Sequence, residues 1–176
     1  MTDGVDRLWA GWRSAYVAGA ANKSRNEHPG DENASVFTRI LTSGLSDEET
    51  NIVHRGSEVF AILNAFPYGT GHLLVMPVRE VAKLDELSRS ESAELWSTIQ
   101  DAVQAIEQAY RPDGVNVGFN LGKAAGAGVP GHLHAHVLPR WSADTNFMSS
   151  VANAKVLPEA LDETARKLRQ AWPKRP

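Results

Sequence analysis

The chain has 176 residues, a length that corresponds to about one domain of ordinary size. Its 18 lysine and arginine residues against 21 aspartate and glutamate residues give a net charge of −3, which excludes a broad cationic surface for a nucleic-acid polymer. Cysteine is absent, which excludes disulfides, a catalytic thiol and a thiolate zinc site.

The N-terminus shows no sign of a targeting segment. No basic stretch followed by an apolar run opens the chain, so no signal peptide is expected. The longest apolar runs, such as Phe60–Leu63, are too short to cross a bilayer. We therefore expect a soluble cytoplasmic protein that contacts no membrane.

The first 50 residues favour helices joined by a polar loop. Residues 6–20 place apolar and tryptophan side chains at helical spacing, which predicts a short amphipathic helix. Residues 21–34 are polar and rich in turn-forming residues, which indicates a loop. A second short helix is predicted over Val36–Leu41.

From Ile52 the pattern changes to that of strands. Ile52–His54 and Glu58–Asn64 flank a short turn and predict a β-hairpin. After the turn Pro67–Gly71, His72–Pro77 is predicted to form a third strand. Gly114–Leu121 and His132–Pro139 are predicted as the fourth and fifth strands, with the glycine-rich loop Gly122–Gly131 between them.

Two longer helices complete the prediction. Ser88 and Glu91 form a capping-box pattern, and apolar residues then recur at helical spacing as far as Tyr110, where Arg111–Gly114 ends the helix. A C-terminal helix is predicted over Glu159–Trp172, preceded by a proline. Hairpins with separately grouped helices indicate the α+β class: a five-stranded antiparallel sheet with one long helix plus N- and C-terminal helices.

We interpret residues 1–176 as a single domain. Residues 1–50 would be a helical N-terminal extension and loop, residues 51–145 the core, and residues 146–176 a C-terminal segment and helix.

The segment Gly131–Val137 carries the most chemical information. Side chains alternate between the two faces of a strand, so His132, His134 and His136 are expected on one face. Three interpretations are open. The histidines could be buried and hydrogen-bonded, they could ligate a metal, or one could be a nucleophile suited to attack on phosphorus.

The loop before this segment narrows the choice. Gly126–Gly131 matches the G-x-G-x-x-G pattern of dinucleotide-binding folds, but Pro130 and a strand follow it where that fold needs a helix. The loop is then either a plain connection or a backbone cradle for a phosphate beside the histidines.

On these residues the chain resembles the histidine triad (HIT) family of nucleotide hydrolases and transferases. The resemblance runs from about Leu8 to Trp172 and includes Asn64–His72 and Asn120–Gly122 besides the triad. Within the family, the chain is similar to the bacterial branch that contains diadenosine-tetraphosphate phosphorylases and hydrolases. The resemblance implies a HIT-like fold and a homodimer. It also implies cleavage at the α-phosphate of dinucleoside polyphosphates or nucleoside phosphoramidates through a nucleotidyl-histidine intermediate.

The resemblance also implies roles for individual residues. His134 would be the nucleophile, with its tautomer set by the carbonyl of His132, and His132 and His136 would flank the phosphate. The remaining nucleotide-binding positions are Asn120, Gly126 and Gly128 at the phosphates, Asn64 at the ribose hydroxyls, Ile62 and Leu74 at the base, and His72 in support of the triad. For Asn64, capping of the following turn is the alternative.

The chain departs from the family pattern in two places. One is the zinc site, and the other is a phosphate-contacting position that bears on which acceptor releases the nucleotide. Relatives of this branch hold zinc through a Cys-x-x-Cys pair, a histidine after the third strand and the first triad histidine. Here Ser35–Thr38 occupies the cysteine pair and Glu80 the outer histidine position, so we expect no zinc and no tightly bound cofactor. Magnesium bound to the nucleotide substrate stays open. Gly128 stands where some relatives carry a phosphate-contacting serine.

Two other function classes stay open at this point. A non-catalytic nucleotide-binding or sensor protein could keep the same pocket, and a metallohydrolase could use the three histidines as ligands.

Overall fold

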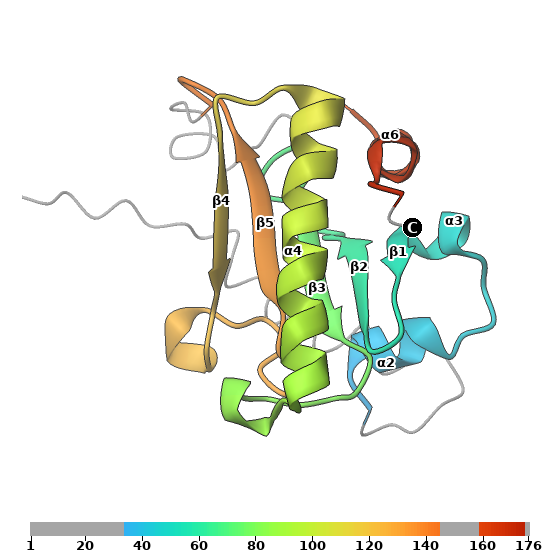
Figure 1. Cartoon of the computed structure of the whole chain (residues 1–176), viewed down its shortest axis with the longest axis vertical. Coiled ribbons are helices and arrows are strands. Elements are labelled where there is room, and N and C mark those ends of the chain that lie inside the picture. Colours follow the sequence, from blue (N-terminus) through green and yellow to red (C-terminus); the bar gives the residue numbers. More distant parts are fainter. Residues whose placement is uncertain (1–33, 145–158, 175–176) are drawn as a thin grey trace, which may run out of the picture. The chain divides into compact units, whose positions relative to one another are not determined.

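The computed structural model describes residues 34–144 and 159–174 (Figure 1). The helix predicted over residues 6–20, and nearly all of the loop over 21–34, lie outside them. The chain divides into two compact units, residues 1–28 with 143–156 and residues 29–142 with 157–176. The elements below belong to the second unit, and the single domain stays a prediction.

An antiparallel sheet forms the centre of this unit. Its strands are β1 (Ile52–Arg55), β2 (Val59–Leu63), β3 (Leu73–Pro77), β4 (Gly114–Phe119) and β5 (Ala135–Arg140). The strand order is β1-β2-β3-β5-β4, and every neighbouring pair is antiparallel. The five-stranded antiparallel sheet is therefore confirmed.

Helices flank the sheet. They are α2 (Val36–Leu41), α3 (Asp47–Thr50), α4 (Arg89–Tyr110) and α6 (Leu161–Ala171), with 3-10 turns η1 (Leu84–Glu86) and η2 (Lys123–Ala125). The predicted capping box at Ser88 and Glu91 opens α4, and α2 has its predicted bounds. The sequence pattern missed α3, because four residues are too few to show a helical period.

The two faces of the sheet carry different layers. The long helix α4 crosses one face, with α6 beside it (Figure 1). Side chains at alternate strand positions, such as Ala61, Val75 and Val137, pack there against Leu95 and Ile106 of α4 and are fully buried.

The opposite face carries a second apolar cluster, formed by Phe37, Ile52, Phe60, Ile62, Leu74 and Met76. His136 pairs with Leu74 across β5 and β3, so it lies on this second face. His136, one of the three histidines of the predicted site, therefore lies on the face opposite α4.

The predicted start of β5 was wrong. The strand begins at Ala135, whereas His132 and His134 precede it. The backbone N–H of His132 donates to the carbonyl of Val129 in a turn, and that of Leu133 donates to the carbonyl of Val81 at 2.6 Å. These bonds replace the ladder to β3 that a longer strand would make. Two smaller differences concern element ends. The strand β4 ends at Phe119 rather than at Leu121, and α6 spans Leu161–Ala171 rather than Glu159–Trp172.

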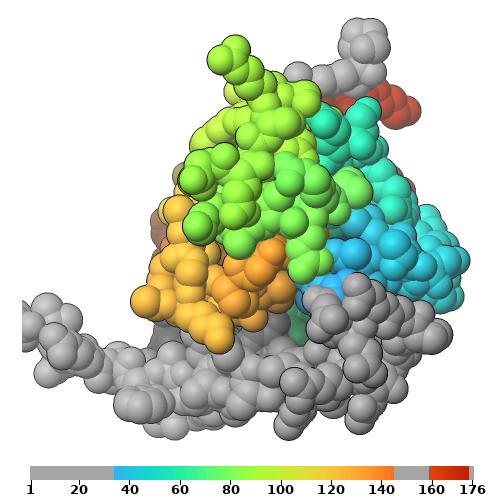
Figure 2. Space-filling model, turned by 90° about the horizontal axis from the view of Figure 1, so that it is seen from below, coloured from blue at the N-terminus to red at the C-terminus, as the bar shows by residue number. Residues whose placement is uncertain are grey.

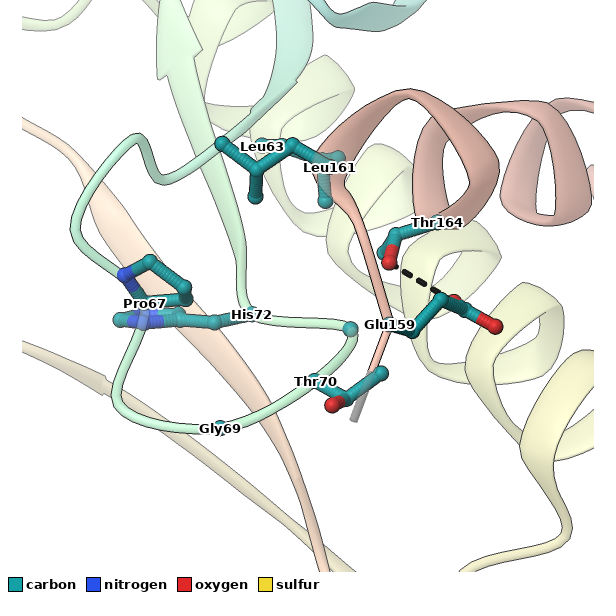
Figure 3. Close-up of a pocket in the computed structure, with 9 residues that line it drawn as sticks. Leu63, Pro67, Gly69, Thr70, His72, Glu159, Leu161 and Thr164 are labelled. Atoms are coloured by element: carbon teal, nitrogen blue, oxygen red, sulfur yellow. Dashed lines mark hydrogen bonds between the residues drawn. The ribbon is translucent and has the colours of Figure 1, made fainter. Parts of the chain in front are cut away.

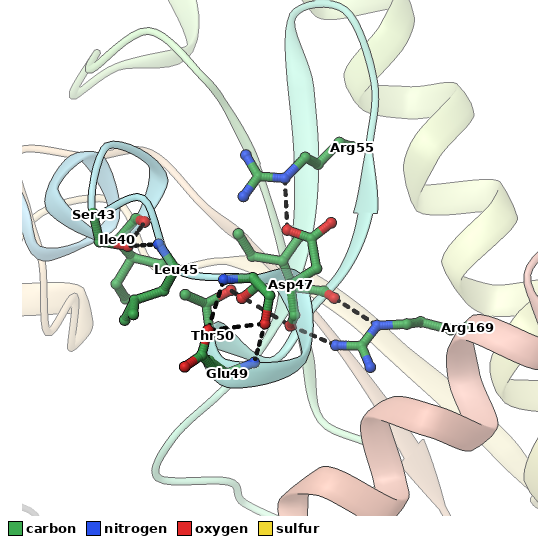
Figure 4. Close-up of polar contacts among 10 residues, drawn as sticks. Ile40, Ser43, Leu45, Asp47, Glu49, Thr50, Arg55 and Arg169 are labelled. Atoms are coloured by element: carbon green, nitrogen blue, oxygen red, sulfur yellow. Dashed lines mark hydrogen bonds and ion pairs between the residues drawn. The ribbon is translucent and has the colours of Figure 1, made fainter.

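Arginine side chains tie α6 to the start of the sheet (Figure 4). Arg169 donates to the carbonyl oxygens of Ile52 at 2.8 Å and Asp47 at 2.6 Å, and the Asp47 carboxylate accepts from Arg55 at 2.7 Å.

Within the described residues, no helix is both long and apolar enough to cross a bilayer.

Candidate active site

The three triad histidines lie together but in different surroundings. The rings of His134 and His136 are 5.1 Å apart, and Phe37 of α2 packs against the rings of both His132 and His134 at 5.5 Å. His132 and His134 are buried, whereas His136 is partly exposed. The same residue type therefore has three distinct environments within five positions.

His134 has the hydrogen bonding of a nucleophile. Its Nδ1 lies 2.7 Å from the carbonyl oxygen of His132, and a carbonyl only accepts, so Nδ1 carries the hydrogen. The lone pair of the neutral ring is then at Nε2, which has no hydrogen-bond partner among the described residues. Burial lowers the pKa of His134, which favours this neutral form.

His132 is held on both ring nitrogens. Its Nε2 donates to the carbonyl of Pro77 at 2.8 Å, and its Nδ1 lies 2.7 Å from the hydroxyl of Ser35. The side chain has no exposed surface, and burial lowers its pKa. Neither nitrogen is available to a phosphate. The geometry therefore speaks against the expectation that the His132 ring flanks the phosphate, because the protein itself uses both nitrogens.

His136 receives its orientation from His72. The backbone N–H of Tyr68 donates to His72 Nδ1 at 3.0 Å, so the hydrogen of the neutral His72 ring is on Nε2. That Nε2 lies 2.9 Å from His136 Nδ1 and donates to it. The hydrogen of His136 is consequently on Nε2.

Asn120 adds a second donor at the same point. Its Nδ2 lies 3.2 Å from His136 Nε2. With the amide placed this way, both nitrogens are donors, so they do not bond each other, and a ligand acceptor between them would accept from both. A phosphate oxygen is an acceptor of this kind. The structure thus brings the predicted phosphate residues His136 and Asn120 together.

Asn64 caps the turn after β2. Its Oδ1 accepts from the backbone N–H of Phe66 at 3.0 Å, which is the turn-capping role. Its Nδ2 lies 3.4 Å from His72 Nδ1. That nitrogen has a single lone pair, already used by Tyr68, so the amide N–H remains able to donate to a ligand.

The predicted base positions lie on the same face as the histidines. Ile62 and Leu74 are buried in the second apolar cluster, and Val129 of the glycine-rich loop packs against that cluster. Gly126 has a φ of +92°, which disfavours any other residue, whereas a methyl group at Gly128 would meet open space. Their contacts with a nucleotide stay predictions.

The positions that correspond to zinc ligands in relatives form a hydrogen-bonded cluster here. The Glu80 Oε2 atom accepts from the backbone N–H of Ser35 and from the hydroxyl of Thr38, both at 2.9 Å. Figure 2 shows the blue atoms of α2, the green segment after β3 and the orange loop before β5 side by side. This cluster does not fit tetrahedral zinc, because His132 has no free nitrogen and the other groups are mutually bonded.

Two pockets of this unit do not fit a nucleotide. One, lined by His72, Thr70 and Glu159 among others, has a volume of about 10 Å³, enough for one water molecule (Figure 3). The other, of about 400 Å³, is lined by Glu58, Arg79 and Glu91 among others. Arg79 is already paired with Glu91 at 2.7 Å, so the remaining charge is that of Glu58, which disfavours a polyphosphate. The histidine cluster therefore remains the chemically competent site.

Comparison with known proteins agrees with this geometry. The family model described as HIT domain matches residues 46–143, which include β1 to β5 and all three triad histidines. The chain belongs to the HIT domain family. The AP-4-A phosphorylase of Mycobacterium tuberculosis is 44% identical over 174 residues, covering 99% of this chain and 88% of the relative.

More distant HIT proteins share parts of the chain. The asymmetrical bis(5′-nucleosyl)-tetraphosphatase of Schizosaccharomyces pombe is 38% identical over 96 residues, covering 51% of this chain and 52% of that protein. The crystal structure of a Zn-bound histidine triad family protein from Mycobacterium smegmatis has a TM-score of 0.64 and 26% identity. It covers 78% of this chain and 92% of that one.

Several residues that contact the histidines were not predicted from the sequence. Tyr68 acts through its backbone and through a ring stacked 4.8 Å from that of His72. Ser35 and Phe37 approach from a helix about 95 residues earlier in the chain. A backbone donor leaves no residue-type signal, and only the resemblance placed Ser35 near His132.

Proposed function

We propose that this HIT-family enzyme cleaves dinucleoside polyphosphates of the diadenosine tetraphosphate type, or nucleoside phosphoramidates, through a nucleotidyl-His134 intermediate. The observation that carries the proposal is that the His134 ring, with its lone pair at Nε2, lies 5.1 Å from the His136 ring, whose Nε2 donor lies beside that of Asn120 Nδ2. A nucleophile beside donors for a developing charge is the arrangement that phosphoryl and nucleotidyl transfer requires.

The reaction has two displacements. His134 Nε2 attacks the α-phosphorus, a P–N bond forms, and the bond to the leaving group breaks. A leaving polyphosphate departs as its anion, whereas a leaving amine takes up a proton from water. Donors at His136 and Asn120 stabilise the charge on the phosphate oxygens. An acceptor then attacks the same phosphorus, the P–N bond breaks and His134 is regenerated. Water as acceptor gives a nucleoside monophosphate, and inorganic phosphate gives a nucleoside diphosphate.

The remaining predicted site residues also have roles in this proposal, and the role of His132 differs from the predicted one. Asn64 binds the ribose through its amide N–H, and Ile62 and Leu74 contact the base. The backbone N–H of Gly128 binds phosphate, whereas that of Gly126 already donates to the carbonyl of Lys123 at 3.0 Å. His132 acts through its backbone carbonyl rather than as a phosphate ligand, and His72 orients His136.

The alternative functions have weaker support. Among the described residues, no group of three histidine, aspartate or glutamate side chains could hold a metal ion. Both ring nitrogens of His132 are hydrogen-bonded to other protein groups, so His132 has no nitrogen left to ligate a metal in a three-histidine site. A non-catalytic sensor gains nothing from a nucleophilic lone pair at His134, and the relatives cited above are named as enzymes.

The deciding experiment combines one variant with one substrate panel. His134→Ala is expected to lower kcat by several orders of magnitude with an unchanged melting temperature, since an interaction made only in the transition state is lost. Turnover within about tenfold of the parent would contradict the covalent route. Diadenosine tetraphosphate with and without inorganic phosphate then identifies the acceptor, since nucleoside diphosphate forms only with phosphate.

We also infer a cytoplasmic homodimer. The edge strand β4 is largely exposed, and Trp96, Val117 and Leu121 expose large apolar side chains near it, with the Trp96 and Phe119 rings 6.3 Å apart. Exposed strand edges with apolar surface favour pairing with a second chain. Sedimentation analysis of the parent and of Val117→Glu tests this: a dimeric parent and a monomeric variant are expected, and a monomeric parent would contradict it.

A further inference from the structure

A second hydrogen-bonded chain leads from the surface to His134, separate from the one that runs through His72 to His136. It runs from the Glu80 carboxylate to Ser35 and Thr38 at the N-terminus of α2, and from Ser35 to the His132 ring. These residues come from α2, the segment after β3 and the segment before β5. All the contacts lie between 2.7 and 2.9 Å.

The groups at the two ends of this hydrogen-bonded chain, the Pro77 carbonyl and the Glu80 carboxylate, only accept, and this determines which groups donate. The carbonyl of Pro77 only accepts, so His132 Nε2 carries the hydrogen and the Nδ1 of the neutral ring accepts. The Ser35 hydroxyl is therefore the donor to His132 Nδ1. The Glu80 carboxylate only accepts, so the Thr38 hydroxyl donates to it, as does the backbone N–H of Ser35.

His132 connects this chain to the nucleophile. Its ring is fixed by Ser35 on one side and Pro77 on the other, and its own carbonyl accepts from His134 Nδ1 at 2.7 Å. A carbonyl can hold the neighbouring ring only if its own residue is held. His132 lies in a turn before β5, where no ladder bond restrains it.

We propose that Ser35 and Glu80 are positioning residues for His134. Glu80 holds the N-terminus of α2, Ser35 holds the His132 ring, and the His132 carbonyl keeps the hydrogen of His134 on Nδ1 and its lone pair on Nε2. A cluster of protein hydrogen bonds thus performs the orienting task, without a metal ion. The inference rests on the proposed function, in which His134 attacks phosphorus.

The variants separate hydrogen bonding to His132 from capping of the helix. Ser35 also caps α2, because its hydroxyl accepts from the backbone N–H of Thr38. Ser46 caps α3 in the same way without touching a histidine. Ser46→Ala is therefore the matched control for Ser35→Ala. Ser35→Thr and Glu80→Gln are the conservative variants, since each keeps the atom type that makes the bond.

Single-turnover kinetics gives the first readout. Ser35→Ala is expected to slow formation of the nucleotidyl-enzyme by about tenfold or more, the effect of losing one buried hydrogen bond, with a smaller change in KM. Glu80→Ala loses two bonds nearer the surface and should slow the same step by a smaller factor. Ser35→Thr and Glu80→Gln should restore most of the rate, and Ser46→Ala should retain the parent rate. A full parent rate in both alanine variants, or an equal loss in Ser46→Ala, would overturn the inference.

Nitrogen NMR of the histidine rings gives a second readout that needs no turnover. In the parent, His134 should show the Nδ1–H tautomer and His132 the Nε2–H tautomer. Ser35→Ala should shift both rings toward tautomer exchange, and unchanged spectra would count against positioning. If the parent formed no nucleotidyl-histidine, the proposed function would fail, while these spectra would still decide whether Ser35 orients the rings.

Discussion

His72 and His136 share a hydrogen bond of 2.9 Å between His72 Nε2 and His136 Nδ1, although 64 positions separate them in the chain. The bond exists because β5 lies directly beside β3, so that the residue before β3 meets the second residue of β5. It places the hydrogen of His136 on the nitrogen that faces Asn120.

Removing His72 should therefore impair the reaction more than binding. In His72→Phe, His136 loses the donor to its Nδ1, and its hydrogen can move to that nitrogen. We expect kcat to fall by roughly 10- to 100-fold, with a smaller change in KM. His54→Phe is the control, since His54 stacks on Trp172 away from the triad. Similar kcat values for the two variants would contradict this role of His72.

Asn64→Ala tests two roles of one side chain. The variant loses the cap on the backbone N–H of Phe66, so the melting temperature should fall by a few degrees. It also loses the amide N–H proposed to bind the ribose, so KM should rise about tenfold for a ribonucleotide. A 2′,3′-dideoxy substrate should show no such rise. An equal effect on both substrates would leave only the turn cap.

Acid should destabilise the protein before its carboxylates titrate. Burial lowers the pKa of His54, His132 and His134 in the folded state. Below about pH 6.5 the unfolded chain therefore binds more protons than the folded one, and the free energy of unfolding falls as the pH falls. Melting temperatures between about pH 7 and pH 5 should decrease, with a shallower slope for His54→Gln. An identical slope would show that His54 does not contribute.

Arg169 should stabilise the fold more than its neighbour Arg166. Arg169 donates to the carbonyls of Ile52 and Asp47, whereas Arg166 pairs with exposed Glu163 on its own helix. Arg169→Met should cost about 1–3 kcal/mol, which lowers the melting temperature by roughly 3–10 °C. Arg166→Met should cost less than about 1 kcal/mol. Thermal denaturation of both variants compares them directly, and the reverse order would contradict this account.

Local patterns were sufficient for the elements that depend on local interactions. The capping box at Ser88 and the helical period behind it predicted α4, because both signals arise within one or two turns of the same helix. Short apolar runs such as Leu73–Pro77, bounded by turn residues, predicted strands, and β2 and β3 are buried on both faces. The start of β5 was wrong, because Leu133 bonds to Val81 rather than to the sheet.

The sequence by itself determined the α+β class, the strands, the long helix and a cluster of three histidines with His134 at its centre. Only the tertiary structure decided what each histidine contacts. The partners of His132 and His136 are Ser35, Pro77 and His72, which lie 55 to 97 positions away. Such contacts follow from the strand order and from the docking of α2, and no local period or residue type encodes them. The same residue type therefore offers a lone pair, serves as a buried support or donates a hydrogen bond according to the partners that the fold supplies.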